Sequence, residues 1–65
     1  MDPERIVLLT HQGRTFVFRV DYEPPGAFWN VESEGRAYRS PLLVSGKEEP
    51  GFFRSLAHVA VLNGV

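Results

Sequence analysis

The sequence contains no cysteine, and this absence excludes disulfide bonds, thiolate catalysis and zinc sites with cysteine ligands. Long apolar runs are also absent: the longest, Ile6 to Leu9, has four residues, whereas a membrane-spanning helix needs about 20. The opening residues, MDPER, carry two acids and a proline where a secretory signal would carry basic residues and then an apolar run. We therefore expect a cytoplasmic protein that is not bound to a membrane.

An excess of either charge is lacking as well. Seven Lys and Arg residues stand against eight Asp and Glu residues, a net charge of -1, so nucleic acid or anionic lipid could be bound only by a local patch. Hydrophobic residues make up 43% of the chain, which favours a packed core over disorder. We expect one small globular domain, residues 1–65, and a chain of this size buries only about 60% of its unfolded surface. Association with another chain would add stability.

Four segments have the composition of β-strands, and glycine or proline separates each from the next. They are RIVLLT (5–10), TFVFRVDY (15–22), AFWNVES (27–33) and RAYRSPLLV (36–44). The first two read as a hairpin, EPPG as a four-residue loop, and Glu34-Gly35 as a tight turn. Pro41 cannot donate to a strand ladder, which places the fourth segment at a sheet edge or ends its pairing there.

The last segment, PGFFRSLAHVAVLNGV, favours a single helix of about 12–14 residues. Pro50 suits the first position of a helix, and Asn63-Gly64 is a typical stop signal. Its final part, HVAVLNGV, alternates and is rich in valine, so a fifth strand is the alternative for residues 57–62. The predicted fold class is α+β: a small antiparallel sheet of three to four strands in meander order, with one C-terminal helix packed on one face.

These turns define a register in which each strand presents one face to the helix. The face predicted to be covered collects Val7, Leu9, Phe16, Phe18, Val20, Tyr22, Trp29, Val31 and Tyr38. The opposite, outer face collects Ile6, Leu8, Val17, Arg19, Asp21, Phe28, Asn30, Glu32, Ala37 and Arg39. This outer face is too apolar for a simply solvated sheet, and a second contact is expected on it.

Seven outer-face residues are candidates for partner binding. Four of them are apolar, and together they would form a patch typical of an interface; they are Ile6, Leu8, Val17 and Phe28. The other three, Arg19, Asn30 and Arg39, fall on one row across three strands. The two guanidinium groups could hold phosphates or a partner's carboxylates, or they could pair with Asp21 and Glu32 on the same face.

No residues have the spacing of a catalytic, cofactor or metal site. His11 and His58 are 47 residues apart and have no third ligand or orienting group near them in sequence. Ser40, Ser45 and Ser55 sit in no nucleophile elbow, and Ser45 is better interpreted as a turn or cap residue. The SGKE segment lacks the upstream glycine of a phosphate-binding loop.

We therefore expect a non-catalytic interaction or regulatory protein rather than an enzyme. It would bind a protein partner, or form a homodimer, through the outer sheet face or an edge strand. The alternative is a small protein that binds single-stranded nucleic acid through an arginine and aromatic patch on the sheet. That patch would use Arg19 and Arg39, with Arg14 and Arg36 beside them and Phe28 or Tyr38 for stacking. An enzyme would need a site completed across a dimer.

Overall fold

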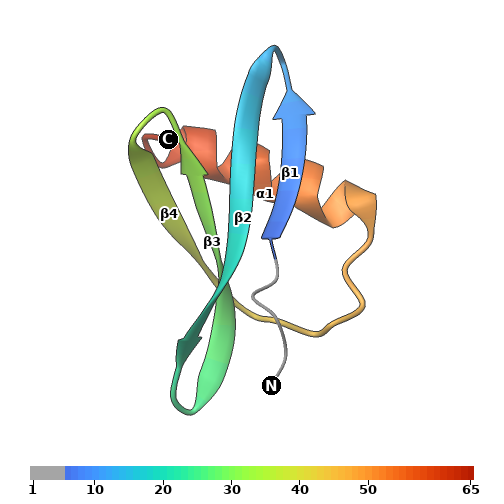
Figure 1. The fold of residues 1–65 in the computed structure, drawn as a ribbon, viewed down its shortest axis with the longest axis vertical. Helices are drawn as coiled ribbons and strands as arrows, with labels where there is room; N and C mark the ends of the chain where they lie inside the picture. Colours follow the sequence, from blue (N-terminus) through green and yellow to red (C-terminus); the bar gives the residue numbers. More distant parts are fainter. Residues whose placement is uncertain (1–5) are drawn as a thin grey trace.

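The computed structural model describes residues 6–65, and the predicted fold is confirmed. Four antiparallel strands form one sheet in the order β1-β2-β3-β4, and one helix, α1, packs across one face of it (Figure 1). The elements are β1 (Ile6–His11), β2 (Arg14–Glu23), β3 (Gly26–Ser33), β4 (Arg36–Leu43) and α1 (Pro50–Leu62). Arg5, which the sequence assigned to the first strand, lies outside the described residues.

Two tight turns fix the outer hairpins. Gln12 and Gly13 have φ of 52° and 77°, and Glu34 and Gly35 have φ of 52° and 78°. Positive φ at both central residues matches the right-handed twist of the flanking strands, which explains why a glycine stands second in each turn. The middle loop is shorter than predicted, because Glu23 pairs with Gly26 and leaves only the two prolines between the strands.

The predicted register is confirmed over most of the sheet. Leu9 pairs with Phe16, Phe18 with Val31, and Val31 with Tyr38. It departs at one place, where Asn30 pairs with Arg39 but Phe28 pairs with Leu43. The two-residue step from Phe28 to Asn30 on β3 therefore lies opposite a four-residue step from Arg39 to Leu43 on β4, which is a bulge. The predicted pairing of Trp29 with Ser40 falls within it.

Pro41 lies within the bulge and supplies its physical reason, since proline has no N–H to donate to the ladder. The Oγ of Ser40 accepts a hydrogen bond from the backbone N–H of Leu42 at 3.1 Å, which closes the bulge locally. The sequence was therefore right to place regular pairing before Pro41 and an edge strand around it.

The core lies between the sheet and α1. Its buried members are Phe16, Phe18, Val20, Trp29, Val31, Phe53, Leu56, Ala57, Ala60 and Val65. Phe53 stands at the centre, with its ring edge-on to Phe18 and to Trp29 at 5.1 Å between centroids in both cases. Tyr22 was wrongly assigned to this core and is 67% exposed, because the end of the β2–β3 hairpin extends past the helix (Figure 1).

The helical interpretation of the last segment is confirmed, and the alternative fifth strand is wrong. Leu56, Ala57 and Ala60 are buried at helical spacing, and these contacts outweigh the strand propensity of the valines. The helix ends at Leu62, and Gly64, with a φ of 96°, turns the chain so that the N–H of Val65 bonds to the carbonyl of Ala60 at 2.9 Å.

Candidate functional site

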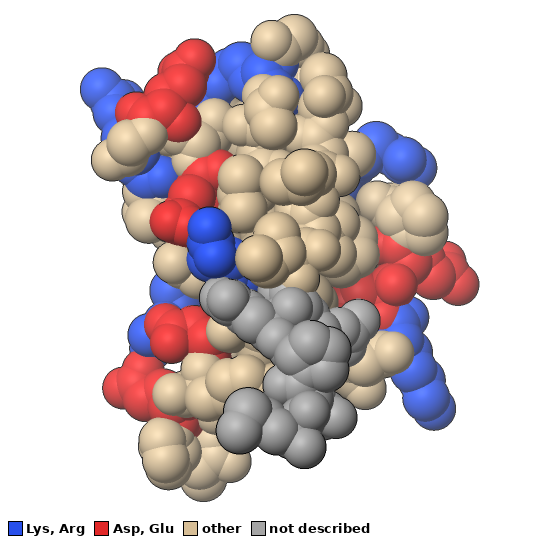
Figure 2. Space-filling view, in the orientation of Figure 1, with Lys and Arg blue, Asp and Glu red and all other residues tan. Residues whose placement is uncertain are grey.

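The outer face of the sheet divides into an uncharged half and a charged half. Figure 2 views this face, with charged residues gathered over β3, β4 and the lower part of β2, and uncharged residues over β1 and the upper part of β2. Across the sheet, one row of side chains runs from Leu8 through Val17 to Glu32. The neighbouring row runs through Ile6, Arg19, Asn30 and Arg39, as the sequence predicted.

The uncharged half contains three of the four apolar candidates. Leu8 lies directly opposite Val17, with Ile6 two residues along the same strand. Ile6 is 47% exposed and Leu8 69%, although both are large apolar side chains. Phe28 does not join them, because the row of Arg19 and Asn30 lies between. We call Ile6, Leu8 and Val17 the β1 patch.

The charged half consists of arginines that face carboxylates. The Nε of Arg19 donates to Oε2 of Glu32 at 3.0 Å. Arg39 bonds to both Asp21 and Glu23, and its guanidinium also lies 5.7 Å from the centre of the Phe28 ring. The pairing alternative that the sequence left open is thus the observed one for both arginines.

Electrostatics follows directly from these pairs. Two guanidinium groups face three carboxylates, those of Asp21, Glu23 and Glu32. A phosphate approaching this half would meet a net negative cluster and would have to displace existing ion pairs. The charged half therefore has no local excess of positive charge that could offset the net charge of -1 of the whole chain.

Arg14 and Arg36, which the alternative prediction placed in a nucleic-acid patch, both bond to the segment after α1. An Nη of Arg14 donates to the backbone oxygen of Val65 at 2.9 Å and to Oγ of Ser33 at 3.3 Å, while Arg36 donates to the carbonyl of Gly64 at 3.1 Å. These arginines fasten the segment after α1 to the β3–β4 turn. Sequence spacing alone could not place that segment, which lies 51 residues from Arg14.

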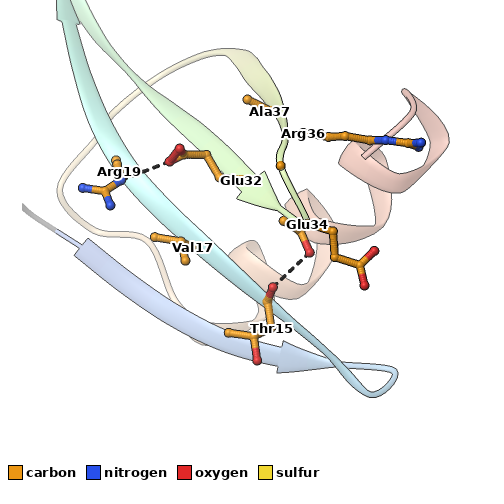
Figure 3. A pocket seen from close by; sticks show the side chains of 9 residues that line it. Thr15, Val17, Arg19, Glu32, Glu34, Arg36 and Ala37 are labelled. Atoms are coloured by element: carbon orange, nitrogen blue, oxygen red, sulfur yellow. Dashed lines mark hydrogen bonds and ion pairs between the residues drawn. The ribbon is translucent and has the colours of Figure 1, made fainter.

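A hollow of about 380 Å³ lies on the outer face beside the β3–β4 turn, and Figure 3 shows its lining. The Arg19–Glu32 pair spans one side, and the Oγ of Ser33 donates to the carbonyl of Thr15 at 3.0 Å across another. The side chains of Glu34 and Arg36 extend away from the hollow. Its charged groups already have partners: Arg19 pairs with Glu32, Glu34 with Arg14, and Arg36 donates to the carbonyl of Gly64.

Sequence reasoning missed a groove of about 350 Å³ between β4 and α1. Its lining is mostly apolar and comprises Tyr38, Ser40, Pro41, Leu42, Phe52, Ser55, Leu56 and Val59. Ser40, Pro41 and Leu42 of its lining lie in the bulged part of β4. Pro41 was the only sequence signal that pointed to it.

The remaining candidates have local structural contacts. His11 lies edge-on to Phe16 with 6.2 Å between ring centres, and His58 is exposed on α1. The Oγ of Ser45 accepts the N–H of Lys47 at 3.1 Å, which confirms its predicted turn role. Within residues 6–65, no three His, Asp or Glu side chains gather in a way that could hold a metal ion.

Glu48 anchors the loop that leads into α1. Its carboxylate accepts the backbone N–H groups of Ser45 at 2.8 Å and Gly46 at 3.0 Å. Burial alone would raise the pKa of Glu48, but these hydrogen bonds, with one from the Trp29 side chain, lower the pKa from 4.5 to about 2. The carboxylate is therefore ionised at neutral pH and stabilises the loop.

Comparison of the chain with protein-family models, with curated proteins and with solved structures finds no match. In the part of the chain that the structure describes, no helix has both the length and the apolar character needed to cross a membrane. Function must therefore be argued from the surface itself.

Proposed function

We propose that this protein is a non-catalytic interaction protein that binds another protein chain through the β1 patch and the adjoining edge of the sheet. One observation carries the proposal: β1 is an edge strand without Asp, Glu, Lys, Arg or Pro, and two of its three outer-face side chains, Ile6 and Leu8, are large, apolar and exposed. Natural edge strands of this kind are usually protected, because their unpaired backbone groups accept a further strand.

The charged half of the same face supports this assignment by contrast. Its arginines already have carboxylate partners within the chain, so these charges need no partner protein and water can solvate them. The β1 patch lies at the strand edge that has no neighbour in the sheet. Polar ion pairs beside an uncharged patch are the usual composition of an interface rim and its centre.

Nucleic acid is the less favoured ligand. Binding of single strands depends on a positively charged groove with accessible aromatic rings. Here Arg19 and Arg39 are neutralised by carboxylates, and the Phe28 ring lies beneath the Arg39 guanidinium. Absence of a mobility shift with single-stranded RNA or DNA at low salt is the expected result.

The test is site-specific crosslinking in cells that produce the protein. A photoreactive amino acid replaces Leu8 in one variant and Leu62 in a matched control, because the two leucines are 69% and 71% exposed and differ only in location. We expect covalent adducts from position 8 that are absent from position 62. These adducts should disappear when Ile6→Asp is added.

Equal labelling at positions 8 and 62, or none at either, would overturn the proposed function. Circular dichroism of each purified variant checks that the sheet and helix are intact. Both leucines are exposed, so we expect their replacement to leave the fold unchanged.

A further inference from the structure

We propose that the occupant of the β1 edge is a second copy of this chain, paired antiparallel through β1 itself with Leu8 at the two-fold axis. The inference rests on the proposed function and names its partner. It would join the two four-stranded sheets into one continuous sheet of eight strands. A two-fold arrangement is the commonest form of homo-oligomer, and it uses the same surface of both copies.

The first step is to establish which backbone groups of β1 point outward. The Oγ of Ser33, on β3, donates to the carbonyl of Thr15, so Thr15 directs its backbone groups toward β3 and away from β1. In an antiparallel pair, opposite residues alternate between exchanging hydrogen bonds and facing away from each other. Thr10, which lies opposite Thr15, therefore directs its N–H and C=O to the free edge, and so do Leu8 and Ile6.

The second step is the register. In an antiparallel pair of β1 strands, residues whose backbone groups point to the free edge must lie opposite each other, because only these residues have unpaired N–H and C=O groups. Placing Leu8 opposite Leu8 of the second copy sets Ile6 opposite Thr10 and Thr10 opposite Ile6. In this register Ile6, Leu8 and Thr10 of both copies all use their edge-facing backbone groups. About six main-chain hydrogen bonds would form, two at each pair. A register shifted by two residues would leave one of these three pairs without a partner and lose its two hydrogen bonds.

Side chains agree with this register on both faces of the sheet. On the outer face, the exposed Leu8 of each copy would cover the other, and Ile6 would lie beside Thr10. On the helix face, a hollow of about 250 Å³ borders the edge, between Val7 and Leu9 on one side and Pro50 and Phe53 on the other. A strand added to β1 would place its own half-buried Val7 and Leu9 over this hollow.

The absence of charge on β1 favours β1 of a second copy as the partner strand. Residues 6–10, which contain the three facing pairs of this register, carry no acidic or basic side chain, so two copies of β1 meet there without repulsion and without an unpaired buried charge. A partner strand with charged side chains would lose their hydration against Ile6 and Leu8 and find no opposite charge there. The strand in this chain that matches those requirements is β1.

Cysteine crosslinking tests the register because the chain has no natural cysteine. Leu8→Cys would bring its thiol opposite the thiol of the second copy at a Cα separation of about 5.5 Å, within the range of a disulfide. Thr10→Cys is the matched control on the same face of the same strand. Its equivalent in the second copy would lie four residues away along the strand, about 14 Å, which is too far.

We expect rapid formation of a disulfide-linked dimer by Leu8→Cys under mild oxidation, at least about tenfold faster than by Thr10→Cys alone. An equimolar mixture of Ile6→Cys and Thr10→Cys should crosslink as a heterodimer, because these positions oppose each other. Light scattering of the unmodified chain should show a mass that rises from 7.3 kDa toward twice that value with concentration.

Two results overturn this inference. One is a constant mass of 7.3 kDa up to millimolar concentration, and the other is equal oxidation rates for Leu8→Cys and Thr10→Cys. The proposed function has a separate readout: position-8 adducts in cells whose mass exceeds one chain by something other than 7.3 kDa would keep that function and exclude the second copy as the partner.

Discussion

The two edges of the sheet differ in every feature that decides whether a strand accepts a neighbour. Edge strand β4 carries Arg36, Arg39 and Pro41, and a bulge interrupts its pairing with β3. Edge strand β1 has none of these and pairs regularly along its whole length. Charges, proline and bulges are the known means by which natural sheets prevent edge-to-edge association. Their concentration on one edge is the asymmetry on which the proposed partner site at the other edge rests.

The contrast extends to the hollows beside each edge. The groove between β4 and α1 is bordered by a strand that cannot continue the ladder past Pro41, so it could receive side chains but not an added strand. The hollow beside β1 is bordered by a strand with free backbone groups. Among residues 6–65, the β1 side places unpaired main-chain groups beside an apolar hollow, and strand addition uses this combination.

The largest effect should come from placing proline at two neighbouring positions of β1. Leu9→Pro removes an N–H that bonds to β2, and we expect it to cost about 3 kcal/mol or more and nearly abolish folding. Leu8→Pro removes an N–H that faces the free edge, so we expect a loss of about 1 kcal/mol or less. Urea denaturation followed by tryptophan fluorescence measures both.

Comparable unfolding of the two proline variants would contradict the assigned direction of the backbone groups in β1. Leu8→Pro would also block the pairing of a further strand with β1, as Pro41 does on β4. A folded Leu8→Pro variant should therefore have lost its association with a second chain, which light scattering would show.

A charge on each edge gives the next largest effect. Leu8→Lys places two like charges at the proposed two-fold axis, and we expect self-association to weaken by at least about 100-fold. Leu42→Lys, at a leucine 60% exposed on β4, should change it less than about twofold. Sedimentation equilibrium of both variants gives the association constants. Similar losses for both leucines would mean that the two edges do not differ in function.

Most of the fold was predictable because its signals are local. Strict alternation in β2 and glycine at the second position of two tight turns predicted the strands and their register, and both were confirmed except at the bulge between β3 and β4. Tyr22 was misplaced because alternation gives the face of a residue but not how far the helix extends over that face. The EPPG loop was predicted to have four residues, but Glu23 pairs with Gly26 and only the two prolines lie between them.

The candidate surface was predictable only in part. Alternation identified which residues share the outer face, but the choice between free and paired arginines depends on side-chain reach, which sequence does not give. The attachment of the last residues by Arg14 depends on the direction in which α1 crosses the sheet. Contacts between elements distant in sequence are therefore the part that only the structure supplied.

Removal of the Arg14 attachment should have a moderate effect. Arg14→Ala loses hydrogen bonds to the Val65 oxygen and to Ser33, together with an ion pair to Glu34 at 3.4 Å. Because the side chain is half-buried, we expect a loss of about 1–2 kcal/mol in the free energy of unfolding. Arg54→Ala, on the exposed face of α1, is the control and should change stability by less than about 0.5 kcal/mol. Equal effects would show that Arg14 does not fasten the segment after the helix.

The smallest effect concerns pH, and it acts on the loop beside the β1 edge. The pKa of Glu48 is lowered to about 2 in the folded protein, against 4.5 for the free side chain, so the folded state binds its proton less readily than the unfolded state. The stabilisation from this carboxylate is therefore complete above about pH 4.5 and disappears as the pH falls from 4.5 toward 2. Glu48→Gln should lower stability at pH 7 and show a smaller further decrease over that range.

Thermal unfolding of the natural chain and Glu48→Gln at a series of pH values measures the difference between them. Glu49→Gln is the matched control, because Glu49 caps the start of α1 without a side-chain hydrogen bond. A constant difference between the natural chain and Glu48→Gln from pH 7 to pH 2 would contradict the assigned role of the carboxylate. If the two converge at low pH while Glu49→Gln follows the natural chain throughout, ionised Glu48 holds the loop that borders the β1 hollow.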